Sequence, residues 1–261
     1  MGGYVMEGSL KWKLFNKSIQ LHRKLAKRHG VDIELINGDK ILIRKMDYDR
    51  ISSDSIAVKT NDYIRSRIME LCAEEIRIRG VRGEVAEAGV FMGEFSWVIE
   101  KCFPERKLYL YDTFEGFDEK DMATEKELFK EGGEWLNITR KSFRNDAYTP
   151  DEQIQYVLGR LEHPENAVVR KGFFPKSAEK ESSECFSFVS LDMDLYKPIL
   201  EGILFFYPKL DRGGYIFIHD YNCSMLKEST HKALSDAENI LGELAYVPIS
   251  DIGGSVVIVK R

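Results

Sequence analysis

The chain has 261 residues, with 38 Lys and Arg against 43 Asp and Glu for a net charge of −5, and 43% of its residues are hydrophobic. This length and composition suit one large α/β domain with an appendage, and the acidic balance argues against a general nucleic-acid binder. Four scattered cysteines without Cys-x-x-Cys spacing favour reduced thiols over a disulfide framework or a zinc site. No signal peptide is visible, and no apolar run approaches the about 18–20 residues of a transmembrane helix. We therefore expect a cytoplasmic protein without stable membrane insertion.

The N-terminal part of the sequence, residues 1–58, is predicted to form an appendage to the main domain. Residues 8–31 contain seven Lys or Arg and no acid, and their apolar residues fall at helical spacing, which indicates a basic amphipathic helix. Such a helix either packs one face on the body of the protein or touches a membrane surface or an acidic partner. Residues 32–44 hold two apolar runs around Asn37-Gly38, the pattern of a β-hairpin with a tight turn.

From about residue 60, short β-rich runs alternate with helical segments. A helix is predicted over 61–80, and further helices over 94–103, 150–162, 197–208 and 225–242. The β-rich runs, which each stop at a glycine or an acid, are "GEVAEAGV", "KLYLYD", "AVVRKG", "CFSFVSLD" and "GGYIFIHD". Alternation of this kind implies right-handed crossovers and a parallel sheet. Because the final runs "LAYVPI" and "SVVIVKR" are separated only by "SDIGG", they predict an antiparallel hairpin. The expected fold over 59–261 is an α/β, Rossmann-like doubly wound sheet, mostly parallel and closed by a C-terminal β-hairpin.

One long segment without a predicted strand, residues 113–149, interrupts this alternation. Segments of this length inside compact domains are usually functional lids or disordered insertions. We interpret 113–149 as a partly helical lid over a site at the C-terminal ends of the strands, where doubly wound sheets bind their ligands.

The first two predicted strands of this sheet end in residues suited to a cofactor. The first ends in Glu87-x-Gly89-x-x-x-Gly93, in which the glycines allow a tight turn and close approach of a ligand to the backbone. The Gly-x-Gly-x-x-Gly pattern of a dinucleotide site is absent, and an acid before the turn suits a cofactor with an ammonium group. The second strand ends at Asp112, the position at which an acid holds a ribose diol. This combination indicates S-adenosyl-L-methionine more than NAD, and hence a class I methyltransferase.

Several longer motifs resemble the macrocin O-methyltransferase (TylF-like) family of sugar O-methyltransferases. They are "GEVAEAGVFMGEFS", "LYLYDTFEGF", "VRKGFFPKS" and "SLDMDLYKPILEGILFFYPKLDRGGYIFIHDY", and the similarity runs from about residue 60 to the C-terminus. The resemblance implies dependence on S-adenosylmethionine and on a divalent cation, usually Mg²⁺. The expected cofactor-binding residues are Glu87, Gly89, Val90, Gly93, Asp112, Thr113, Gly116, Thr149, Gly172 and Phe173. For Thr149, a helix N-cap is favoured over the cofactor contact. The aromatic residues Trp97, Trp135 and Tyr196 are candidates for an acceptor pocket, although core packing is the more frequent role.

The stretch "SLDMDLYKP" places Asp192 and Asp194 two positions apart, which on a strand is the same face. Two like charges repel there unless a cation or a proton lies between them. By resemblance, Asp192 is a metal ligand and Asp194 the general base, while Asp220 in "FIHDYN" is a second metal ligand. His219 stands where better-studied relatives have another Asp. As a ligand it would shift the preference from Mg²⁺ toward Mn²⁺, Fe²⁺ or Zn²⁺, and the alternatives are a core histidine bonded to a backbone carbonyl or a substrate-facing proton acceptor.

The function expected from these features is metal-assisted methyl transfer from S-adenosylmethionine to a hydroxyl of a sugar or glycosylated small molecule. One alternative is an NAD-dependent sugar oxidoreductase or epimerase, against which the missing Gly-x-Gly-x-x-Gly counts. Another is a catalytically silent binding module, against which the intact carboxylates count. The sequence identifies neither the acceptor nor the oligomeric state, so a homo-oligomer stays open.

Overall fold

The structure, a computed structural model, describes residues 17–18, 20–22, 24–25, 31–36, 40–45, 55–139, 148–181 and 184–261. Those between 17 and 25 are helical. Strands β1 (Val31–Ile36) and β2 (Lys40–Lys45) pair antiparallel in a sheet of their own, with Ile36 opposite Lys40. Much of the predicted basic helix over 8–31 lies outside the described residues, as do residues 140–147 of the predicted lid. Within those described, no helix is both long enough and apolar enough to cross a membrane.

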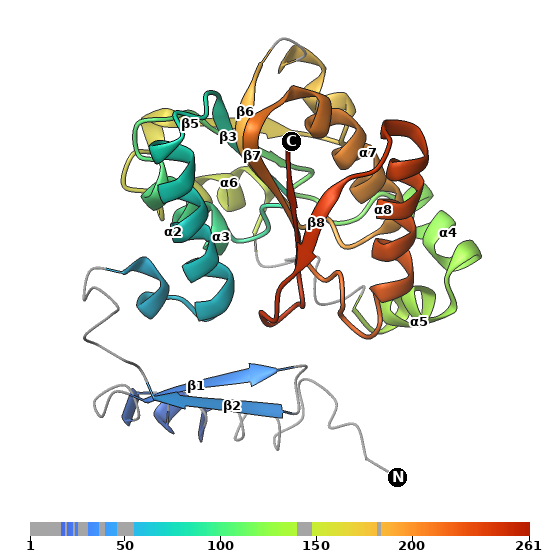
Figure 1. Cartoon of the computed structure of the whole chain (residues 1–261). Helices are drawn as coiled ribbons and strands as arrows, with labels where there is room; N and C mark the ends of the chain where they lie inside the picture. The colour runs from blue at the N-terminus through green and yellow to red at the C-terminus, as the bar shows by residue number, and fades with distance from the viewer. Residues whose placement is uncertain are drawn as a thin grey trace.

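A seven-stranded sheet organises the rest of the chain (Figure 1). Its strands are β3 (Glu84–Ala88), β4 (Leu108–Asp112), β5 (Ala167–Lys171), β6 (Phe186–Leu191), β7 (Leu210–Ile218), β8 (Ala245–Pro248) and β9 (Val256–Val259). They are arranged in the order β5-β4-β3-β6-β7-β9-β8. The first five are mutually parallel, whereas β9 runs antiparallel to both β7 and β8. The predicted fold class, including the closing hairpin, is confirmed.

Helices cover both faces of the sheet. They are α2 (Tyr63–Ile78), α3 (Glu94–Cys102), α4 (Glu119–Leu128), α5 (Lys130–Thr139), α6 (Pro150–Leu158), α7 (Tyr196–Phe206) and α8 (Lys227–Leu241). Short 3-10 helices lie at Ile56–Lys59, Pro164–Asn166, Lys176–Glu181 and Tyr207–Lys209. Helices α2, α3 and α6 pack on one face, and α7 and α8 on the other (Figure 1). The result is the three-layer arrangement that buries both faces of a parallel sheet.

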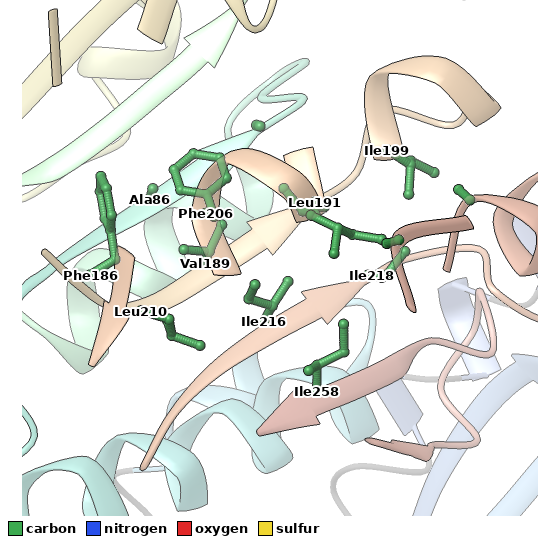
Figure 2. Close-up of a cluster of buried hydrophobic side chains, with 14 of the residues drawn as sticks. Ala86, Phe186, Val189, Leu191, Ile199, Phe206, Leu210, Ile216, Ile218 and Ile258 are labelled. Atoms are coloured by element: carbon green, nitrogen blue, oxygen red, sulfur yellow. The ribbon is translucent and has the colours of Figure 1, made fainter. Parts of the chain in front are cut away.

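The alternation of side chains along β6 shows how one strand supplies two cores. Phe186, Val189 and Leu191 face the core under α7 and α8, where Ile199 and Phe206 meet them (Figure 2). Phe188 belongs instead to the core on the opposite face, with residues of α2 and α3. The register of β6 against β3 and β7 shifts near the beginning of the strand. This irregularity lets Phe186 and Val189, three positions apart, face the same core. A strand buried on both sides explains why "CFSFVSLD" is apolar without strict alternation.

The sheet order reverses direction beside β3, which pairs with β4 on one side and β6 on the other. At such a switch point the loops that follow the two neighbouring strands diverge and leave a crevice. The backbone amide of Asp192 donates to the carbonyl of Ala88 over 2.8 Å and so extends the β3–β6 ladder by one step toward this crevice.

The described part of the 113–149 segment includes two helices, α4 and α5. Helix α4 packs against α7, and α5 lies against α8. The amide of Tyr196 at the start of α7 donates to Glu125 Oε2 over 2.9 Å, and the rings of Phe129 and Tyr196 lie 5.5 Å apart. Residues 119–139 are therefore docked on the body of the domain, while closure of a lid on ligand binding stays a prediction.

Candidate active site

A cavity of about 1110 Å³ opens at the C-terminal ends of β3, β4, β6 and β7. Its wall includes the loops after these strands, the N-terminal part of α2, the start of α6 and both helices of the 113–149 segment. This volume lies just above the about 300–1,000 Å³ range of small-molecule sites in proteins.

The turn after β3 lies in direct contact with the end of β6. Gly89 has φ +87°, and a Cβ atom placed on it would lie 2.0 Å from the carbonyl oxygen of Asp192. Since an L side chain would meet both the strained φ and this clash, the position requires glycine. The close approach joins the predicted cofactor turn to the predicted catalytic strand end.

The carboxylate of Asp112 holds the same turn from the other side. Its Oδ2 accepts from the amides of Val90 and Phe91 over 2.7 and 2.9 Å, and its Oδ1 accepts from the amide of Phe114 over 2.7 Å. Thr113 closes the following loop through a 2.6 Å hydrogen bond to the carbonyl of Gly116. Asp112 thus fixes the glycine turn in addition to lining the cavity.

Glu87 contributes a buried carboxyl at the end of β3. Only 2% of it is exposed, and its Oε2 accepts from the hydroxyl of Ser96 on α3. Burial raises the pKa of Glu87 to about 8, and the Ser96 bond and the charge of Arg65 offset only part of that rise. A carboxyl with this pKa gains most from a cationic partner, because the partner stabilises the ionised form that burial disfavours.

Asp192 lies between two cationic groups of the protein. Arg65 of α2 contacts its Oδ2 over 3.0 Å and also donates to the hydroxyl of Ser190 over 2.9 Å. The guanidinium stacks 3.8 Å from the ring centre of Phe95. On the other side, His219 Nδ1 lies 3.1 Å from Asp192 Oδ1. Although burial opposes it, the charges of His219 and Arg65 hold the pKa of Asp192 well below its usual range.

Asp194 and Asp220 complete an acidic group around His219. Strand β6 ends at Leu191, so Asp194 reaches the cavity through a left-handed backbone (φ +61°) and not through strand alternation. Asp220 also adopts positive φ, +55°, and its Oδ2 lies 3.2 Å from His219 Nδ1. Burial, reinforced by the charges of Asp220 and Asp192, raises the pKa of Asp194 well above the usual range. Without a cation, Asp194 therefore favours its protonated form.

His219 is fixed from behind by the β8–β9 loop. A Cβ atom on Gly253 would lie 2.5 Å from His219 Nε2, so the loop backbone closes over the ring. Asp251 in the same loop is buried and accepts from the amide of Ser255 over 2.6 Å. The "SDIGG" linker, which the sequence suggested only as a turn, therefore packs against the candidate site.

Three residues at this site fit a divalent cation. One ligand atom from each of Asp192, His219 and Asp220 lies within 4.8 Å of the others. The separations of 3.1 and 3.2 Å from Nδ1 to the two carboxylate oxygens match the about 3 Å between adjacent ligands of an octahedral ion with bonds of 2.0–2.1 Å. Buried Nδ1 makes no hydrogen bond of acceptable geometry to any described residue. Without an ion, burial is outweighed by the charge of Asp192, which raises the pKa of His219 and favours the cationic ring. A bound divalent ion would replace the ring proton, and the lone pair of Nδ1 would then be a ligand.

Comparison with known proteins places the chain in a family. Residues 54–250, about three quarters of the chain, match the model of the macrocin-O-methyltransferase (TylF) family. The chain belongs to this family. Among its curated relatives, the mycinamicin III 3''-O-methyltransferase of Micromonospora griseorubida is 24% identical over 212 residues, 77% of each protein. An 8-demethyl-8-(2,3-dimethoxy-α-L-rhamnosyl)-tetracenomycin-C 4'-O-methyltransferase of Streptomyces olivaceus is 22% identical over 176 residues, 62% of each.

Solved structures show the same fold. The O-methyltransferase NovP superposes with a TM-score of 0.62 at 19% identity, covering 76% of this chain and 80% of its own. The calicheamicin methyltransferase CalS11 gives 0.56 at 14% identity, covering 75% and 78%. As a member of the macrocin-O-methyltransferase family, the chain is an O-methyltransferase.

Most residues predicted from the sequence gather in the cavity of this methyltransferase. Those that line it are Glu87, Gly89, Val90, Asp112, Thr113, Gly116, Gly172, Phe173, Asp192, Asp194, His219 and Asp220. Gly93 and Thr149 do not line this cavity. Gly93 is the left-handed N-cap of α3, and Thr149 forms a capping box with Glu152 at the start of α6, the role that the sequence favoured.

The aromatic candidates divide in the same way. Trp135 lines the cavity. Trp97 packs against the core beneath α3, and the hydroxyl of Tyr196 donates to Asp236 over 2.7 Å, so these two serve packing and surface contacts.

Sequence reasoning missed three residues of the site. Arg65 lies on the buried stripe of α2 that continues through Met69, and a lone arginine in an apolar stripe was the available signal. Ser96, in the first turn of α3, gave no such signal. Asp121 of α4 also lines the cavity, and its place in a charged segment concealed it.

Proposed function

We propose that this protein is an S-adenosylmethionine-dependent, divalent-cation-assisted O-methyltransferase that methylates a hydroxyl of a sugar or glycosylated small molecule. The observation that carries the proposal is the convergence of Asp192, Asp194, His219 and Asp220 in one cavity with the Glu87–Asp112 pair. Family membership supports the reaction class, and a curated relative whose name specifies a rhamnosyl compound as the acceptor supports the acceptor class.

The two strand-end acids divide the recognition of the methyl donor between them. Glu87 receives the ammonium group of the amino-acid part, which compensates its buried charge. The backbone of the glycine turn contacts the same end of the cofactor. Asp112 has about four acceptor directions, of which three are used by backbone amides, so it accepts from one ribose hydroxyl. Gly172 and Phe173, after β5, bound the adenine side.

The acid cluster activates the acceptor. Asp192, His219 and Asp220 would hold the cation, which when bound lowers the pKa of the acceptor hydroxyl and directs its oxygen. Asp194 takes the hydroxyl proton as the oxygen attacks the methyl carbon and the carbon–sulfur bond breaks, which yields an ether and S-adenosylhomocysteine. A cation held by Asp192 and Asp220 would offset the negative charge that favours a proton on Asp194, so that its carboxylate could act as the base. Arg65 keeps Asp192 ionised and fixes the orientation of its carboxylate through Oδ2.

An acceptor screen with labelled methyl donor tests the proposal. The protein is incubated with methyl-labelled S-adenosylmethionine, Mn²⁺ and either pooled glycosides or pooled phenols, and label in each product is counted. Label in the glycoside pool, abolished by Asp194→Asn, is the expected result. Thermal shift with S-adenosylhomocysteine and NAD side by side checks the cofactor separately. Stabilisation by NAD alone, or label only in phenols, would overturn the proposed cofactor or acceptor respectively.

A further inference from the structure

Asp121 is a buried acid in the wall of the cavity that neither the cofactor site nor the acid cluster uses. It lies in the first turn of α4, is 4% exposed, and lines the same cavity as Asp194. Its Oδ1 has no hydrogen-bond partner and is not exposed to the cavity, so the side chain must turn slightly for this atom to meet a ligand. Within the part of the chain that the structure describes, no hydrogen bond or ion pair reaches this carboxylate.

A buried carboxylate of this kind destabilises the protein unless a ligand donates a hydrogen bond to it. A buried carboxylate without a partner costs free energy, because it gives up hydration without a replacement bond. The charged residues around Asp121 do not offset this cost. Burial and the charge of Asp118 raise the pKa of Asp121 to about 6, and the opposing charge of Lys197 is too weak to prevent the rise. An acid in the first turn of a helix gains from the helix dipole, but solvent-exposed Glu119 in the same turn has that benefit without the burial.

Two aromatic side chains line the same cavity as Asp121. Trp135 of α5 and Phe117 line the cavity, with their ring centres 5.8 Å apart. An aromatic face packs against the apolar C–H face of a sugar ring, whereas a carboxylate accepts bonds from adjacent hydroxyls at the edge of the ring. A cavity that offers both surfaces discriminates a polyhydroxylated ring from a flat phenol.

We propose that Asp121 is an acceptor-binding residue that accepts hydrogen bonds from sugar hydroxyls other than the one methylated, with the sugar ring packed on Trp135. The inference rests on the proposed function and deepens it, because it assigns specificity for polyhydroxylated rings to the 119–139 helices. An acceptor without these hydroxyls leaves Asp121 buried and unpaired, and a site built in this way rejects such an acceptor strongly.

Direct binding of a glycoside and of its deoxy analogues tests the proposal. The probes are methyl α-L-rhamnopyranoside and its mono-deoxy analogues, measured by saturation-transfer NMR at millimolar concentration with S-adenosylhomocysteine present. We expect the parent to bind the full glycoside about tenfold to hundredfold more tightly than at least one deoxy analogue, the loss that follows from an unmade bond to a buried charge. In Asp121→Ala this preference disappears, while Glu119→Gln, a matched change on the same helix turn, retains it.

Two outcomes of this experiment would overturn the proposal. An unchanged preference in Asp121→Ala overturns the proposal, and so does the absence of any glycoside binding by the parent. If Asp121→Ala fails to fold by circular dichroism, Asp121→Asn and Trp135→Leu replace it and must lower glycoside affinity without changing the Kd of S-adenosylhomocysteine. The proposed function fails separately: glycosides that bind through Asp121 but never accept labelled methyl contradict methyl transfer and leave the binding residue in place.

Discussion

Replacing Arg65 by methionine tests how the acid cluster is held together in the absence of any cation. The guanidinium is 7% exposed, lies 3.0 Å from Asp192 Oδ2 and 2.9 Å from Ser190 Oγ, and stacks 3.8 Å from the centre of Phe95. Methionine keeps the apolar contact with Phe95 but removes the charge and both bonds. Asp192 is then left with His219 as its cationic neighbour.

The expected loss follows from this geometry. Removing one partner of a buried ion pair costs about 3–5 kcal/mol. Because Asp192 is 23% exposed and retains His219, we place Arg65→Met at the lower end of that range, a loss of about 3 kcal/mol in the free energy of unfolding. Arg67→Met is the matched control: its guanidinium lies 2.7 Å from Glu70 Oε2 but is 33% exposed, and such a pair contributes about 0–1 kcal/mol.

Urea unfolding in chelator measures both variants. The pKa of Asp192 is depressed in the folded state, so its pairing stabilises the protein above the unfolded pKa of about 3.9 and the benefit is lost as the pH falls below it. The two variants and the parent are therefore compared at pH 6, about two units above that pKa, where the carboxylate of Asp192 is ionised in both the folded and the unfolded state. Adding Asp192→Asn to Arg65→Met should recover part of the loss. A loss in Arg65→Met no larger than that in Arg67→Met would refute the reasoning.

Three other predictions concern the two halves of the cavity. The pKa of Glu87 is raised in the folded state, so the stability of the parent declines as the pH rises from 4.5 to about 8. In urea unfolding, the stability of Glu87→Gln relative to the parent should therefore grow across that window by at least about 1 kcal/mol. A difference that does not change with pH would contradict the raised pKa of Glu87. Asp194→Asn should lower kcat by about 10²–10⁴ with unchanged calorimetric affinity for S-adenosylhomocysteine, and full turnover would exclude it as the base. Gly89→Ala should lose at least about 2 kcal/mol more stability in the same unfolding assay than Gly242→Ala, which shares the positive φ but has open space around it. Equal losses would show that the contact with Asp192 is unimportant.

The sequence predicts the sheet and much of the site because both depend on local patterns. Apolar runs that end in glycine or acid mark strand ends, and strand ends of a parallel sheet converge on one edge. The sequence does not predict the position of a side chain that depends on contacts between residues far apart in the chain. Arg65 joins the site only because α2 packs across the end of β6, and Asp194 enters the cavity by a left-handed residue and not by the strand alternation that suggested it. Asp121 became recognisable only when α4 was seen docked on α7.

Cation dependence of methyl transfer tests the central claim most directly. Parent protein and His219→Asp are treated with chelator, and transfer of labelled methyl to a glycoside is then measured while Mg²⁺, Mn²⁺ or Zn²⁺ is added back. Because His219 supplies a nitrogen beside two carboxylates, we predict loss of activity in chelator and better recovery with Mn²⁺ than with Mg²⁺ in the parent. In His219→Asp, which presents only oxygen ligands, the preference should move toward Mg²⁺. Full activity of the parent in excess chelator would contradict the account.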